Sequence, residues 1–99
     1  MTYVVIWSYE VSDDHVPDFS NAYGGRGPWH SLFEKAHGYI RTDLLQDDTS
    51  YNHYITLDYW QSQEDYKDFT NDFHKQYQSI DMDCEQLTLS EEYIGGFQT

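Results

Sequence analysis

The chain has 99 residues, the size of one small domain, and its 18 acidic and 5 basic residues give a formal net charge of -13. This charge argues against nucleic acid and anionic membrane surfaces as partners, because phosphate binding needs Lys and Arg. The single cysteine, Cys84, excludes an intrachain disulfide, and no apolar run approaches the roughly 18 residues of a membrane span. We therefore expect one soluble, cytoplasmic domain over residues 1–99. Its acidity indicates a solvated surface or adaptation to salt.

The first part of the chain predicts a strand and two short helices. Residues 3–11 alternate as a strand does, and one face carries Tyr3, Val5, Trp7, Tyr9 and Val11. Residues 15–23 form a short helix that tolerates Pro17 in its first turn. After the glycines of residues 24–27, Pro28 begins a second short helix, whose apolar face carries Trp29, Leu32, Phe33 and Ala36. Gly38 is expected to end it in a left-handed conformation.

The second part predicts a hairpin, a long helix and a last strand. Residues 39–46 and 51–60 form the hairpin around the polar turn at 47–50. Ser62 caps the following helix, with Asp65 three residues on. One face of that helix carries Tyr66, Phe69, Phe73, Tyr77 and Ile80. Residues 81–87 continue or restart the helix, and residues 88–97 form the fourth strand.

The predicted order of elements is β, α in two pieces, β, β, α, β. This is the split βαβ pattern of ferredoxin-like α+β domains, with a four-stranded antiparallel sheet. The helices cover one face of such a sheet. The apolar and aromatic residues on the other face predict that a second copy covers it, so we expect a homodimer, a dimeric α+β barrel.

Five segments carry a resemblance to a known family. They are VVIWSYEV, FSNAYGGRGPWHSLF, GYIRTDLLQD, YITLDYWQSQEDYKDF and the terminal CEQLT…EEYIGGF. In this order and spacing they resemble the antibiotic biosynthesis monooxygenase-like (ABM) domains of the dimeric α+β barrel superfamily. The resemblance covers nearly the whole chain. It implies a homodimer with a cavity between helices and sheet in each protomer.

The resemblance also implies a chemistry. The family includes oxygenases that act on electron-rich aromatic compounds without a cofactor, and enzymes that degrade haem. Haem-degrading members use an Asn, a Trp and a His, and the last two positions correspond here to Phe69 and Ser79, so haem degradation is not expected. Members that oxidise aromatics are similar in placing a Trp at the end of the third strand and a Tyr in the next helix, which Trp60 and Tyr66 match. Thr56 stands where these members have an Asn.

The candidate catalytic residues are thus Trp60, Tyr66, Asp58 and His53. Asp58 shares a strand face with Trp60 and, if buried, has the raised pKa of a general base, whereas an ion pair with Arg41 on the neighbouring strand is the simpler interpretation. His53 is a second possible base, or a hydrogen-bonded histidine on the dimer face. Trp60 and Tyr66 have a plain packing interpretation as well.

The residues expected to line a substrate site are Thr56, Tyr54, Trp29 and Phe69. We expect no metal, because His30 and Glu34, one helical turn apart, lack a third ligand, and we expect no cofactor. Two functions remain open. One is a cofactor-independent monooxygenase acting on a small electron-rich aromatic, and the other is a non-catalytic small-molecule-binding or assembly protein with the same fold.

Overall fold

A computed structural model describes all of residues 1–99. Its strands are β1 (Tyr3–Val11), β2 (Tyr39–Gln46), β3 (His53–Trp60) and β4 (Thr88–Gln98). Its helices are α1 (Val16–Tyr23), α2 (Pro28–Phe33), α3 (Gln63–Asp72) and α4 (His74–Cys84), with single 3₁₀ turns at Asp13–His15 and Glu85–Leu87. The predicted order of elements is confirmed, β1 and β2 have the predicted bounds, and the other boundaries differ by at most three residues.

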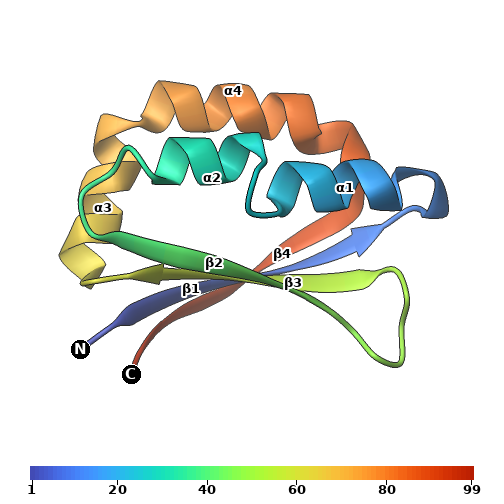
Figure 1. Cartoon of the computed structure of the whole chain (residues 1–99), viewed down its shortest axis with the longest axis horizontal. Helices are drawn as coiled ribbons and strands as arrows, with labels where there is room; N and C mark the ends of the chain where they lie inside the picture. The colour runs from blue at the N-terminus through green and yellow to red at the C-terminus, as the bar shows by residue number, and fades with distance from the viewer.

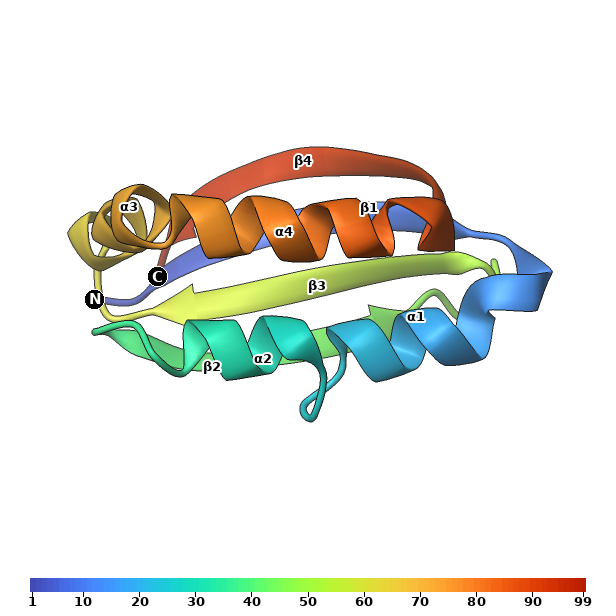
Figure 2. The same ribbon diagram turned by 90° about the horizontal axis from the view of Figure 1, so that it is seen from above.

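The four strands form one antiparallel sheet in the order β2-β3-β1-β4, which is the ferredoxin-like arrangement. All helices lie on one face of this sheet (Figure 1). Seen from above, they form two rows: α1 and α2 run along one side of the sheet, and α4 runs along the other with α3 at its end (Figure 2). The predicted fold class is therefore confirmed.

The core between these layers is aromatic. On β1 the inward face is the predicted one, with Tyr3, Val5, Tyr9 and Val11 buried. Phe19, Trp29, Phe33 and Phe69 meet them from the helices. Trp60 is completely buried, and its ring lies 5.1 Å from Phe69 and 5.4 Å from Tyr39, centroid to centroid. Burying several large rings supplies most of the apolar area that so short a chain can remove from water.

The structure explains why glycine occupies two positions of the chain. Gly38 has φ +87°, so the predicted left-handed stop after α2 is confirmed. Gly96 on β4 faces the Tyr3 ring so closely that an added Cβ would overlap it. Gly96 therefore makes room for a core tyrosine.

The expected long helix is divided. Phe73 has φ -111° and ψ 21°, which separates α3 from α4. The apolar positions keep their spacing of three and four through the break, and the rings of Phe69 and Phe73 stack at 5.5 Å. No Gly or Pro marks the change of direction, so the pattern predicted one helix. The break lets α3 pack at the end of the sheet while α4 runs along it (Figure 2).

A register shift in β2 changes which residue faces Asp58. Tyr39 lies opposite Trp60, but the next pair joins Arg41 to Tyr59, so Ile40 is an extra residue. A regular strand would place Arg41 opposite Asp58. The shift places Thr42 there instead and turns Arg41 to the outer face, where it pairs with Asp43 (Nε to Oδ1, 3.4 Å) and lies 4.1 Å from the Tyr59 ring centre. The expected Arg41–Asp58 ion pair is therefore wrong.

Candidate active site

A cavity with an aromatic lining lies between the two rows of helices and the sheet. Its floor is formed by β1, β2 and β3, and its walls by the α1–α2 segment, α4 and β4. The interior accessible to the centre of a water molecule is about 30 Å³, and the space including the open mouth is about 500 Å³. The inner part thus has room for about two or three waters, and the cavity opens to solvent. The residues that line it include Tyr9, Trp29, Thr42, Thr56, Asp58 and Glu91.

Asp58 is the buried charged group of this cavity. It is 8% exposed, and β3 points it inward between Thr56 and Trp60. Burial raises the pKa of Asp58 to about 6, and a hydrogen bond from Thr42 opposes part of the rise. The other carboxylate oxygen, Oδ2, accepts no hydrogen bond from the protein and is not sealed from the cavity. A carboxylate of this kind is a suitable general base near neutral pH.

A short chain of hydroxyl groups supports the carboxylate. Thr42 donates its Oγ1 hydrogen to Asp58 Oδ1 at 2.6 Å. Because that hydrogen is committed, the Tyr39 hydroxyl, 2.7 Å from Thr42 Oγ1, is the donor to Thr42. The chain runs from the carboxylate to a half-buried tyrosine, and it exists because the shift in β2 brings Thr42 to the inner face.

Other polar groups in the walls are hydrogen-bond donors. Burial raises the pKa values of the Tyr9, Tyr23 and Tyr77 hydroxyls, so these phenols stay protonated at neutral pH. The Tyr9 hydroxyl lies 3.2 Å from Thr56 Oγ1. The Trp29 indole N–H is buried close to the Tyr23 hydroxyl and the Cys84 thiol, but it makes no hydrogen bond of regular geometry within the protein. A buried donor without a partner is uncommon, and a bound molecule or water would satisfy it.

The mouth carries two further carboxylates, Asp81 on α4 and Glu91 on β4. Both residues are exposed. Partial burial raises the pKa of Glu91, and the neighbouring charges of Asp81 and Glu85 raise it further. The carboxylates at the mouth therefore repel one another, and neither makes an ion pair within the protein.

The structure brings together only part of the predicted site. Asp58, Thr56 and Trp29 line the cavity. Trp60 and Tyr66 lie behind its wall. Their rings are 5.7 Å apart, and the Trp60 indole N–H has no hydrogen-bond partner. Tyr54 and Phe69 are buried in the core without reaching the cavity surface. Roles for these last four residues stay predictions.

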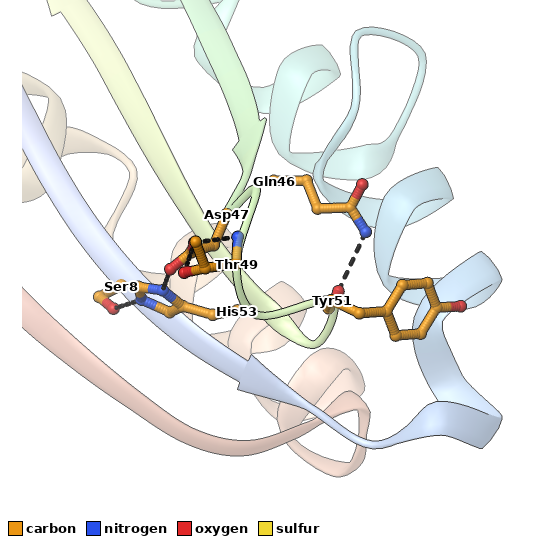
Figure 3. A network of polar contacts seen from close by, with 6 residues as sticks. All are labelled: Ser8, Gln46, Asp47, Thr49, Tyr51 and His53. Carbon is orange, nitrogen blue, oxygen red and sulfur yellow. Dashed lines mark hydrogen bonds and ion pairs between the residues drawn. The ribbon is translucent and has the colours of Figure 1, made fainter.

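His53 lies on the other face of the sheet, in a network of its own (Figure 3). Its Nδ1 lies 2.8 Å from Asp47 Oδ2 and its Nε2 2.6 Å from Ser8 Oγ. Hydrogen bonds from His53, and then from the backbone and side chain of Thr49, hold the pKa of Asp47 well below its usual range. The order Ser–His–Asp is that of a nucleophile and its base. However, Ser8 is in a central strand, where the ladder occupies the backbone amides that an oxyanion hole needs. We therefore interpret the network as a link between the β2–β3 turn and β1.

Several cavity residues were not predicted. Tyr9 and Tyr77 lie on the predicted inward faces of their elements, and that periodicity is the signal that could have found them. Asp81 comes directly after Ile80, the last residue of the apolar face predicted for the long helix. The side of the sheet on which Glu91 lies depends instead on the irregular pairing of β4 with β1. Nothing in the sequence marks the shift that brings in Thr42.

Two further features bear on partners. Within the chain, no three His, Cys, Asp or Glu side chains converge as metal ligands would. His30 pairs with Glu34, as their spacing allows. No helix has both the length and the apolar composition needed to cross a bilayer.

Comparison with solved structures supports the fold over the whole chain. A candidate antibiotic biosynthesis monooxygenase of Bordetella bronchiseptica superposes with a TM-score of 0.76 at 15% identity, covering 99% of this chain and 96% of that one. A conserved protein of Methanosarcina mazei Go1 gives 0.73 at 14% identity, covering 100% and 93%. SnoaB of Streptomyces nogalater, a cofactor-independent oxygenase, gives 0.65 at 14% identity, covering 99% and 92%.

Sequence comparison identifies the family. No curated protein matches the chain. The model of the antibiotic biosynthesis monooxygenase family matches residues 2–78, which include β1 to β3 and the site residues Thr42, Thr56 and Asp58. The chain therefore belongs to the antibiotic biosynthesis monooxygenase family.

Proposed function

We propose that this protein is a cofactor-independent monooxygenase that oxidises a small electron-rich aromatic compound, with Asp58 as its general base. The observation that carries the proposal is the buried Asp58 carboxylate, with one oxygen unpartnered, at a cavity with aromatic walls. Family membership and the likeness in fold to SnoaB support the same reaction class.

The reaction needs a base and a dry site. Taking an anthrone as the example, Asp58 removes a proton from the acidic methylene and leaves an enolate. The enolate gives one electron to O₂, and the resulting radical and superoxide combine into a carbon-bound peroxide. The proton held by Asp58 returns to the peroxide, and loss of water leaves the ketone. In sum, one CH₂ and one O₂ give one C=O and one H₂O, which balances without an external reductant.

The surrounding residues have supporting roles in this proposal. The Trp29 N–H and the Tyr9 hydroxyl line the cavity, and we assign them as donors to the oxygen that becomes negative. Thr42 holds the Asp58 carboxylate in place through its hydrogen bond, and Thr56 lines the cavity on the same strand as Asp58. Trp60 and Tyr66 act from behind the wall by fixing the ring of Phe33, which lines the cavity and lies 5.9 Å from Trp60.

The test is oxygen uptake with anthrone and with hydroquinones. We expect uptake with an acid limb near pH 6, the pKa of Asp58, and Asp58→Asn should reduce the rate by on the order of 10²–10⁴-fold, the usual contribution of a general base. Catalase should not change the uptake with anthrone, because the second oxygen atom leaves as water. Absence of turnover with every substrate would contradict the proposal.

The pH profile also tests the identity of the base. Thr42→Val removes the hydrogen bond that lowers the pKa of Asp58, so the acid limb should move to higher pH. Arg41→Gln is the matched control on the same strand. Arg41 faces away from the cavity, so its loss should leave the limb in place. If the acid limb of the pH profile moves in the Arg41→Gln variant and not in the Thr42→Val variant, Asp58 is excluded as the titrating group.

The second candidate is a non-catalytic small-molecule-binding protein. Thr56 favours it, because this residue lines the cavity and stands where the members of the family that oxidise aromatics have an Asn. Saturable binding of the same aromatics without oxygen uptake would identify this function.

A further inference from the structure

The charges around the cavity are all of one sign. Asp58 lies in its interior, and Asp81 and Glu91 lie at its mouth. None of the chain's five Lys and Arg residues lines it. Its single basic side chain, His30, is already paired with Glu34. A cleft lined by one sign of charge concentrates ligands of the opposite sign.

General surface acidity does not account for this arrangement. The net charge of -13 is carried mostly by exposed carboxylates that water solvates. Asp58 is 8% exposed, and its Oδ2 has no partner in the protein. Burying a carboxylate without a cation costs free energy. The buried charge of Asp58 therefore indicates a functional role that a solvated surface carboxylate does not have.

The walls supply a second means of holding a cation. Trp7, Tyr23, Trp29, Phe33 and Tyr77 all line the cavity, and the Trp29 and Tyr77 rings meet edge to face at 4.9 Å. Aromatic faces attract ammonium groups through their quadrupoles, and carboxylates attract them directly. The combination of rings and carboxylates suits an organic amine better than a neutral or anionic aromatic.

We propose that the cavity selects small aromatic compounds that carry a positively charged amine, with the ammonium group between Asp81 and Glu91 and the ring directed toward Asp58. This inference names the substrate class of the proposed monooxygenase, but the binding preference stands whether or not the protein is an enzyme. The inference also removes a difficulty of the proposed reaction, because the carboxylates would repel a negatively charged enolate formed beside them. A substrate that carries its own ammonium group offsets this repulsion.

A matched set of probes tests the preference. Tyramine, tyrosol and 4-hydroxyphenylacetate share a phenol ring and differ mainly in an ammonium, hydroxyl or carboxylate on the side chain. Binding is measured by calorimetry at low salt, with tryptophan fluorescence as a second readout. Tyramine should bind at least 10-fold more tightly than tyrosol, and 4-hydroxyphenylacetate should bind least. Raising the salt to about 1 M should reduce the preference, because the carboxylates at the mouth are exposed.

Two double variants separate the site from the overall charge. Asp81→Asn with Glu91→Gln should reduce the tyramine preference to less than 3-fold. Asp83→Asn with Glu92→Gln changes the net charge equally at exposed positions outside the cavity, and should preserve the preference. Equal loss in both variants would reduce the effect to bulk electrostatics and overturn the inference, as would absence of tyramine binding to the unaltered protein.

The two proposals fail in different ways. If tyrosol and tyramine bind equally while anthrone is still oxidised, the amine preference is wrong and the monooxygenase stands. If tyramine binds preferentially but no aromatic, with or without an amine, supports oxygen uptake, the monooxygenase is wrong and the amine site stands.

Discussion

Asp58 differs from the other acidic residues of this chain by lying inside it. Its pKa of about 6 exceeds the reference value of 3.8, because burial disfavours the ionised form. In the unfolded chain the same group titrates at its ordinary value. Between these two values the folded protein binds more protons than the unfolded one, so the Asp58 contribution makes stability fall as the pH rises. Above about pH 6 Asp58 is ionised in both states, and the full free-energy cost of burying its charge is present.

Replacing this charge should therefore stabilise the fold while removing activity. We expect Asp58→Asn to raise the free energy of unfolding by up to about 3 kcal/mol at pH 8, which corresponds to a shift of about two pKa units. The gain should vanish below about pH 3, where the carboxyl is protonated in both states. Urea unfolding followed by tryptophan fluorescence across this pH range measures the effect.

The control for this prediction is Asp48→Asn. Asp48 is exposed in the β2–β3 turn and makes no side-chain hydrogen bond or ion pair. It reports what removing any one negative charge does to a chain of this net charge. An Asp58 variant no more stable than the Asp48 variant would contradict the idea that the buried carboxylate costs stability.

The residues of the site were predictable only in part. The alternation of β3 placed Thr56, Asp58 and Trp60 on one inward face, and all three are buried. Which of them reaches the cavity depends on how the rings pack, because Trp60 is covered by Phe33, Tyr39, Tyr66 and Phe69. Periodicity identifies a face of a strand, but it does not locate empty space.

Among the elements, α3 begins as its sequence predicts. The Ser62 side chain accepts a hydrogen bond from the Asp65 amide at 3.1 Å, and Glu64 and Asp65 lie in the first turn near the positive end of the helix dipole. This capping is local in sequence. It is therefore encoded without tertiary context.

Ser62→Ala should lower the free energy of unfolding by about 1 kcal/mol, the usual cost of losing an N-cap. Ser79→Ala is the matched control, because Ser79 is exposed within α4 and makes no side-chain hydrogen bond. Thermal or urea unfolding of the two variants provides the measurement. Equal stability of both would mean that packing of Tyr66 and Phe69, rather than the cap, determines where α3 begins.

The whole molecule leaves one face of its sheet uncovered. All helices lie on the other face (Figure 1). Exposed apolar side chains remain on the strands, among them Ile40, Leu45, Leu89, Ile94 and Phe97. The packing of a second copy against this face is the homodimer that the sequence predicts, and it stays a prediction. His53 and its Ser8–Asp47 network lie on the same face.

Light scattering at high concentration should therefore give twice the chain's 11.8 kDa. Leu45→Asp places a charge on the uncovered face, where Leu45 is 47% exposed, and should shift the mass toward the monomer while leaving the fold intact. Met82→Asp is the control on α4, where the side chain is 71% exposed, and should remain dimeric. A monomeric wild-type chain at high concentration would contradict the dimer.

The sequence by itself determined the order of the elements, the α+β class, the inward faces of β1 and β3, the Ser62 cap and the family. These features follow from local periodicity and capping, which depend on residues near one another in the chain. Tertiary structure alone decided the partner of Asp58. Without the extra residue at Ile40, Arg41 would face this carboxylate and neutralise it. The shift brings Thr42 instead, and a neutral hydroxyl leaves a buried charge available for chemistry. A one-residue change in strand register reverses every side chain beyond it, and only the pairing of two distant strands reveals it.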